Sequence, residues 1–109
     1  MTVKNFSELS GFSPLALPCP DKEIDGVYVG DLLSWVMGRM ESGNLWITIM
    51  SNVNVFAVAS LKDASSVILA EGVTLEDEVL KVALDKEINV LSSDKTAYEI
   101  ALICEKILK

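Results

Sequence analysis

Histidine is absent from this chain of 109 residues, and cysteine occurs only twice. Without histidine, the most common general base of enzymes is missing, and so are the serine–histidine and cysteine–histidine pairs of nucleophilic catalysis. Cys19 and Cys104 lie far apart in the sequence and have no histidine with which to complete a zinc site. We therefore expect no catalytic residues, no metal and no cofactor, and we expect two reduced thiols, as in a cytoplasmic protein.

Long hydrophobic runs are also absent, and positive charge is scarce. The apolar segments span only a few residues each, whereas a helix that crosses a membrane needs about 20. Sixteen acidic residues outnumber nine basic ones and give a net charge of −7, which repels the phosphate backbone of nucleic acids. The sequence therefore predicts no membrane insertion and no nucleic-acid binding.

Half of the residues are hydrophobic, which is enough to bury one core in a chain of this length. No repeat, low-complexity tract or linker divides the sequence, and the phosphate-binding motifs GxxxxGK[ST] and GxGxxG do not occur. We therefore predict a single domain over residues 1–109 that does not hydrolyse nucleotides.

Short runs of β-branched and apolar residues alternate with stretches of helical periodicity. The runs predict strands, and we place them at residues 24–29, 45–50, 67–70 and 88–91, with a short extended piece at 14–17. The periodic stretches predict helices at residues 3–9, 31–40, 54–61, 75–83 and 97–108. Regular alternation favours an α/β fold, with a mainly parallel sheet of about four strands flanked by helices.

Residues that typically cap helices lie near the start of the later predicted helices. The residues assigned as caps are Asp31, Asn54, Thr74 in a capping box with Asp77, and one of Ser92, Ser93 and Asp94. Gly43 is placed just beyond the end of the helix that starts at Asp31.

The predicted helix from Asp31 to Met40 carries more large apolar side chains than one buried stripe accommodates. Aromatic residues and methionine are enriched in the cores of protein interfaces. We therefore predict a homodimer whose interface includes Trp35, Met37 and Met40. The alternative is that Trp35 packs inside its own chain.

Loops that follow parallel strands are the places where open sheets bind ligands. Among these loops, Ser92 to Thr96 combines hydroxyl groups with a lysine at the start of a helix, as an anion site would. Simple helix capping is the alternative role for the same residues. The candidate ligand-binding residues are Asn52, Asn54, Gly72, Ser92, Ser93, Lys95 and Thr96.

The two cysteines lie in different settings. Cys104 lies on the apolar stripe of the last predicted helix, where burial suppresses thiol reactivity, so we assign it to the core. Cys19 lies between two prolines in a predicted loop and is the more exposed of the two. Redox activity of Cys19 is the alternative to a plain loop residue.

Several segments together resemble a known family. The run Val-Ile-Leu-Ala-Glu-Gly at residues 67–72, the helix that includes 78–83, the run Ile-Asn-Val-Leu-Ser-Ser at 88–93 and the closing helix resemble the DRTGG domain. Residues 25–34 are similar to an earlier strand and helix start in small stand-alone proteins of this group. The resemblance implies an α/β module like those of phosphotransacetylases and CBS-domain pyrophosphatases, where such domains help to form dimers. It also implies similarity to the N-terminal, non-catalytic part of HPr kinase.

The residues that give this family its name are only partly present. Its Thr-Gly-Gly falls at Ala70, Glu71 and Gly72, and no Asp-Arg dipeptide occurs in the chain. The resemblance covers the part of HPr kinase that carries no phosphate-binding loop, so it implies no kinase activity. We expect a non-enzymatic regulatory, ligand-sensing or dimerisation module. The alternative is a small enzyme or phosphotransfer acceptor that uses Asp31, Ser93 or Cys19.

Overall fold

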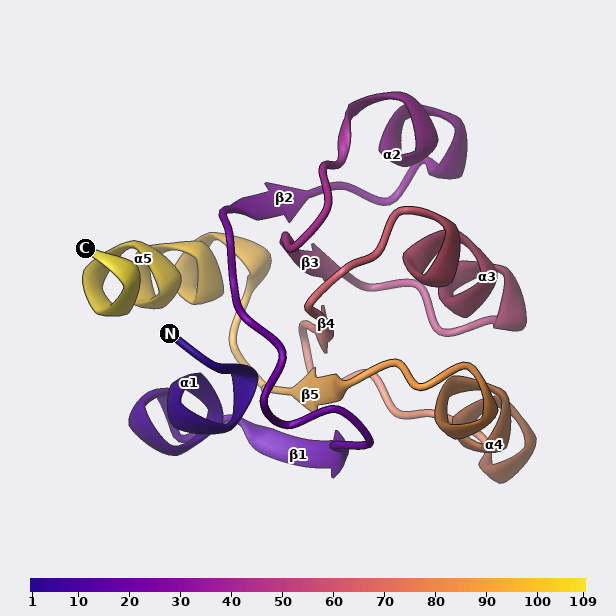
Figure 1. Ribbon diagram of the computed structural model, residues 1–109, viewed down its shortest axis with the longest axis horizontal. Helices are drawn as coiled ribbons and strands as arrows, with labels where there is room; N and C mark the ends of the chain where they lie inside the picture. The colour runs from indigo at the N-terminus through magenta and orange to yellow at the C-terminus, as the bar shows by residue number, and fades with distance from the viewer.

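Ten helices and strands make up the computed structural model, which describes residues 1–109 (Figure 1). In chain order they are α1 Val3–Ser10, β1 Ser13–Ala16, β2 Val27–Val29, α2 Leu33–Arg39, β3 Leu45–Thr48, α3 Val53–Leu61, β4 Ser66–Leu69, α4 Asp77–Asp85, β5 Val90–Ser92 and α5 Ala97–Leu108.

All five strands form a single sheet, in the order β1-β5-β4-β3-β2. The neighbours from β2 to β5 are parallel, and β1 runs antiparallel to β5 at one edge. Figure 1 shows α2, α3 and α4 on one face of the sheet and α1 and α5 on the other. The predicted α/β class with a mainly parallel sheet is therefore confirmed. The fifth strand, β1, corresponds to the piece that was predicted only as extended.

Two hydrophobic clusters, one on each face of the sheet, hold the helices in place. Trp46 and Phe56 belong to the cluster beneath α2, α3 and α4, whereas Phe6, Ile100 and Cys104 belong to the cluster beneath α1 and α5. Every residue of β3 and β4 is buried, as expected for parallel strands that are covered on both faces. No helix is long and apolar enough to cross a membrane.

The prediction of a strand over residues 24–29 was wrong in length, and the strand is exposed where its apolar residues suggest burial. β2 begins only at Val27, because Gly26 takes a φ of 82° that breaks the extended run. As an edge strand, β2 has a neighbour on one side only, and both Val27 and Val29 are exposed. β-branched composition indicates a strand but does not indicate its place in the sheet.

Asp31 and Asn54, which were predicted to cap helices, do not do so. Asp31 does not cap α2, because its carboxylate accepts hydrogen bonds from Thr48 Oγ1 at 2.7 Å and from the backbone N–H of Ile49 at 3.0 Å. Asn52, and not Asn54, caps α3 by accepting from the N–H of Asn54 at 2.9 Å. Each error is a shift of one or two residues at a helix start, where local preference is weakest.

The remaining capping predictions also need correction. Thr74 and Asp77 form no capping box, because α4 starts after Glu76 and has no side-chain cap. Thr96, rather than Ser92, Ser93 or Asp94, caps α5 and forms a complete capping box with Glu99.

The end of α2 differs from the prediction, and so does the position of one residue assigned to the interface. The helix ends at Arg39, so Gly43 is not its cap, and the φ of 85° at Gly43 belongs to the turn before β3. Met40 is only 1% exposed and packs in the core, because it lies four residues after the buried Val36. Trp35 and Met37 are exposed, so of the three residues predicted for the interface only Met40 lies inside the monomer.

Truncation of Ile100 tests the packing of α5. Ile100 is fully buried in the cluster beneath α1 and α5, so Ile100→Ala should lower the free energy of unfolding by about 2 to 5 kcal/mol. The matched control is Leu102→Ala on the same helix, which is exposed and should change stability by less than about 0.5 kcal/mol. Chemical denaturation measures both, and equal effects would contradict this packing.

Candidate functional site

The carboxyl ends of the parallel strands lie together at one end of the sheet. There the chain leaves the sheet in two directions. After β4 it enters α4 on one face, and after the neighbouring β5 it enters α5 on the opposite face (Figure 1). When the helices that follow two adjacent strands diverge in this way, a crevice opens between the two loops. The topology therefore places a candidate site between the β4–α4 loop and the β5–α5 loop.

A hollow of about 240 Å³ occupies this place. The β4–α4 loop contributes Gly72 and Thr74, the β5–α5 loop contributes Ser93 and Asp94, and Leu15 of β1 closes the side. The complete lining is Leu15, Gly72, Val73, Thr74, Leu75, Leu80, Ser92, Ser93 and Asp94. Hydroxyl groups and one carboxylate thus face a partly apolar wall.

Two further hollows share walls with the first. One, of about 250 Å³, shares Ser92 to Asp94 with the first and reaches Ser13 and Lys95. The other, of about 460 Å³, lies between the β3–α3 and β4–α4 loops and is lined by Asn52, Thr74 and Glu76 among others. The carboxyl edge of the sheet is therefore hollowed along the ends of β3, β4 and β5.

A tight turn and two backbone hydrogen bonds shape the central hollow. Glu71 and Gly72 both have positive φ, 60° and 71°, and the N–H of Val73 donates to the carbonyl of Ala70 at 3.2 Å, which is the pattern of a type I′ turn. Within the turn, the N–H of Glu71 donates to the Lys95 carbonyl at 2.8 Å, and that of Gly72 donates to the Ser93 carbonyl at 2.9 Å. Gly72 is thus a turn residue, and the turn joins the two loops.

The side chains around this turn remain available to a ligand. A Cβ atom on Gly72 would lie 3.6 Å from Asp94 Oδ1, so the Asp94 carboxylate lies beside the turn. Asp94 is exposed and makes no side-chain hydrogen bond or ion pair within the chain. Ser93 Oγ accepts from the backbone N–H of Lys95 at 3.1 Å, which leaves its own hydroxyl hydrogen free to donate.

The structure gathers most of the candidate ligand-binding residues along this edge. Asn52, Gly72, Ser92, Ser93 and Lys95 all line one of the three hollows.

The other two candidates, Asn54 and Thr96, line no hollow. Asn54 lies in the first turn of α3, and Thr96 is committed to its capping box. Hydrogen bonds from the backbone and side chain of Thr96 hold the pKa of Glu99 below its usual value.

The candidate ligand-binding residues did not include six residues of the central hollow, which are Val73, Thr74, Leu75, Leu80, Asp94 and Leu15. Leu15 is the one that lies outside the two loops and α4. It lies on β1, which pairs with β5, and only this long-range pairing brings it to the crevice. No local pattern indicates that pairing, because residues 13–16 are mostly exposed and include a proline.

The three residues considered for catalysis do not form one site. Cys19 exchanges hydrogen bonds with Asn89, which precedes β5, whereas Ser93 follows the same strand. Cys19 and Ser93 therefore lie at opposite ends of β5. Asp31 lines none of the hollows and is held by Thr48 and Ile49. No group of three or more potential metal ligands occurs.

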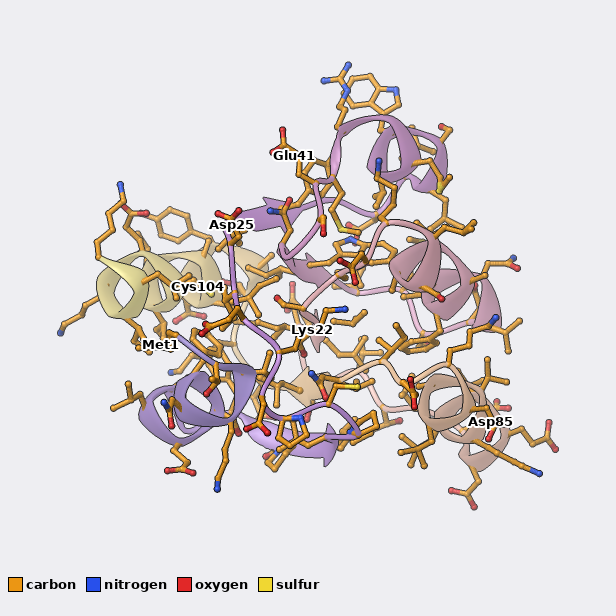
Figure 2. The ribbon with its side chains drawn as sticks, viewed as in Figure 1. Met1, Lys22, Asp25, Glu41, Asp85 and Cys104 are labelled. Atoms are coloured by element: carbon orange, nitrogen blue, oxygen red, sulfur yellow. The ribbon has the colours of Figure 1, made fainter.

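Cys104 lies on the face of α5 that packs against the sheet (Figure 2). Burial, which penalises the charged thiolate, raises the pKa of this thiol to about 11. The prediction that Cys104 is a core residue is confirmed, and the high pKa makes it a poor nucleophile.

No protein-family model matches the chain, and no curated protein matches its sequence. Among solved structures, it is similar to the CBS and DRTGG domains of the regulatory region of Clostridium perfringens pyrophosphatase, complexed with the activator diadenosine tetraphosphate. The TM-score is 0.72 and the sequence identity is 15% over 94% of this chain. This chain spans 45% of the length of that one. The chain therefore shares the fold of part of this regulatory region, and the similarity concerns the fold alone.

Substitution of Gly72 tests the turn that shapes the central hollow. The φ of 71° at Gly72 disfavours any side chain, so Gly72→Ala should destabilise the fold by about 1 kcal/mol. Gly38→Ala is the matched control, because Gly38 is helical and has open space around its missing Cβ. The control should stabilise the fold by about 0.5 to 1 kcal/mol. Thermal or chemical unfolding that showed the same sign for both would contradict the turn.

Thiol labelling tests the environments of the two cysteines. At pH 8, a thiol with a pKa near 11 is ionised on the order of one part in a thousand. We therefore expect a maleimide or disulfide reagent to modify only the half-exposed Cys19 in folded protein and both thiols after unfolding. The Cys19→Ser variant should not react while folded. Rapid labelling of folded Cys19→Ser would show that Cys104 is accessible.

Proposed function

We propose that this chain is a non-enzymatic regulatory module that senses a small polar ligand in the crevice between the β4–α4 and β5–α5 loops. The observation that carries the proposal is the hollow that Gly72, Ser93 and Asp94 line where α4 and α5 diverge. We further propose that residues 1–109 form one DRTGG-like domain, which acts as a cytoplasmic homodimer. The similarity in fold to part of a pyrophosphatase regulatory region supports a regulatory role.

The lining of the crevice suggests the chemistry of the ligand. Leu15, Leu75 and Leu80 offer an apolar surface for a flat ring, and Asp94 can accept hydrogen bonds from hydroxyl or amino groups. Lys95, in the adjoining hollow, is a cation suited to a phosphate group. A nucleotide combines a ring, hydroxyl groups and phosphate, so adenine nucleotides, including diadenosine tetraphosphate, are the first probes.

The position of the crevice also suggests how binding would be transmitted. The loop on one side leads into α4 and the loop on the other leads into α5, on opposite faces of the sheet. A ligand that contacts both loops therefore affects both helical layers at once. Such a coupling suits a module that passes a binding signal to a partner or to a second copy.

The alternative enzymatic role has less support. Ser93 has no histidine in the chain to activate it, and its oxygen already accepts a hydrogen bond from Lys95. Asp31 and Cys19 lie outside the crevice. The arrangement therefore favours binding over chemistry.

Ligand binding can be tested with Asp94→Ala. We expect native mass spectrometry of the purified protein to show a bound nucleotide, or added adenine nucleotides to raise the melting temperature. Asp94→Ala should weaken binding at least tenfold, because it removes the carboxylate beside the Gly72 turn. Its own stability should stay within about 0.5 kcal/mol of wild type, because Asp94 is exposed and unpaired.

The control variant is Asp85→Ala, an exposed acid at the last residue of α4 (Figure 2) that lines none of the three hollows. It removes the same charge and should leave nucleotide binding unchanged. Equal binding by wild type, Asp94→Ala and Asp85→Ala would place the ligand elsewhere. Ligand sensing by this chain would be overturned if no nucleotide changed the melting temperature and no small molecule co-purified with the protein.

A further inference from the structure

The open edge of β2 exposes unpaired backbone groups. The carbonyl of Gly26 accepts from the N–H of Leu45 at 3.0 Å, and the N–H of Gly30 donates to the carbonyl of Ile47 at 3.2 Å. Backbone groups alternate in direction along a strand, so residues 26, 28 and 30 bond to β3. The N–H and C=O groups of Val27 and Val29 therefore point away from the sheet, where no strand follows (Figure 1).

The two edges of the sheet differ in how well they are protected. β1, at the other edge, contains Pro14 and a register irregularity between Pro14 and Ala16, and both features discourage a further strand. The sequence Val27-Tyr28-Val29 has no proline, no charge and no irregularity. Of the flanking acids, Asp31 is turned toward Thr48 and Ile49, so its charge does not guard the edge.

Apolar side chains continue from this edge onto α2. Val29 is 49% exposed, Leu32 is 60% exposed and Trp35 is 55% exposed. The guanidinium of Arg39 stacks 3.9 Å from the ring centroid of Trp35 and forms no ion pair within the chain. Tryptophan and arginine are the side chains most enriched at the energetic centres of interfaces. The edge strand and the beginning of α2 thus combine free backbone groups with uncovered apolar surface.

We infer that β2 pairs antiparallel with β2 of a second copy of this chain, so that the two five-stranded sheets become one continuous sheet. A two-fold axis at Tyr28 places Val27 opposite Val29 of the second copy, and each such pair exchanges two backbone hydrogen bonds. The outward backbone N–H and C=O groups of residues 27 to 29 therefore match the same groups of the second copy, as a symmetric dimer interface requires.

The same axis covers the exposed side chains of α2. Because α2 lies at the same edge of the molecule as β2 (Figure 1), this axis brings the α2 helices of both copies to the interface, and we place the exposed Trp35 there. A strand of three residues alone would bury much less surface than a stable dimer needs, about 1,200 Å² or more, so the dimer requires the α2 contact as well. The inference rests on the dimerisation included in the proposed function, and not on the ligand crevice, which lies at β4 and β5.

Sedimentation velocity at tens of micromolar tests the interface with three variants. Val29→Pro removes an outward N–H without touching the bonds to β3, and proline is tolerated on edge strands. Trp35→Asp places a charge between the two α2 helices. Leu84→Asp is the control, because Leu84 is 45% exposed but lies on α4, away from β2. We expect wild type and Leu84→Asp to sediment as dimers of twice the chain mass of 11.9 kDa. Val29→Pro and Trp35→Asp should sediment as monomers with unchanged circular dichroism.

Hydrogen exchange on the wild type keeps the inference testable if a variant fails to fold. The amides of Val27 and Val29 should be protected at high protein concentration and should exchange rapidly after dilution below the dissociation constant. A monomeric wild type would overturn the inference and leave this edge to a different protein. A dimer with rapidly exchanging Val27 and Val29 amides, or a dimeric Val29→Pro, would overturn the pairing of β2.

Nucleotide binding by Val29→Pro separates this inference from the ligand site. A monomeric variant that still binds the nucleotide with wild-type affinity supports both proposals independently. A dimeric wild type with protected Val27 and Val29 amides but no nucleotide binding would overturn ligand sensing and leave the interface established.

Discussion

Burial of β3 and β4 on both faces is the constraint on which the rest of this structure depends. Every residue of these two strands is buried, so helices must cover both sides of the sheet. The connections between β2 and β5 all place their helices on one face, which leaves the other face to α5 and α1. The divergence of α4 and α5, and with it the crevice, follows from this need to cover both faces.

Polar side chains at the amino and carboxyl ends of the parallel strands differ in their hydrogen bonding. At the amino end, Asn89 donates to the carbonyls of Cys19 and Ser65 at 2.7 and 2.9 Å and so closes the loops over the core. Nearby, hydrogen bonds from Lys22 and Ser42 hold the pKa of Asp63 below its usual value. These polar groups are thus satisfied by each other, whereas the buried hydroxyl of Ser65 at the same end has no hydrogen-bond partner. At the carboxyl end the side chain of Asp94 stays free, as the proposed ligand site requires.

The proposed ligand crevice and the open edge of β2 occupy separate parts of one sheet. The crevice is built from loops after β4 and β5, whereas the proposed interface uses the far strand and α2. Strand β3 and helix α3 connect the two regions through the larger core cluster, which includes Trp46, whose Nε1 donates to the Gly30 carbonyl at 2.9 Å. Ligand binding and dimerisation can therefore be measured independently. Any coupling between them would pass through the packing of this core cluster.

The sequence by itself determined the fold class, the approximate positions of the helices and of strands β2 to β5, the buried Ile100 and Cys104, and the turn at Gly72. Apolar periodicity and the conformational freedom of glycine are local properties, and they act in the same way in any fold. Tertiary structure decided which side chains cap the helices, that Met40 is in the core while Trp35 is exposed, that β2 is an edge and that Leu15 reaches the crevice. These features depend on which strands become neighbours, and that choice arises from burial summed over the whole chain, which no local pattern contains.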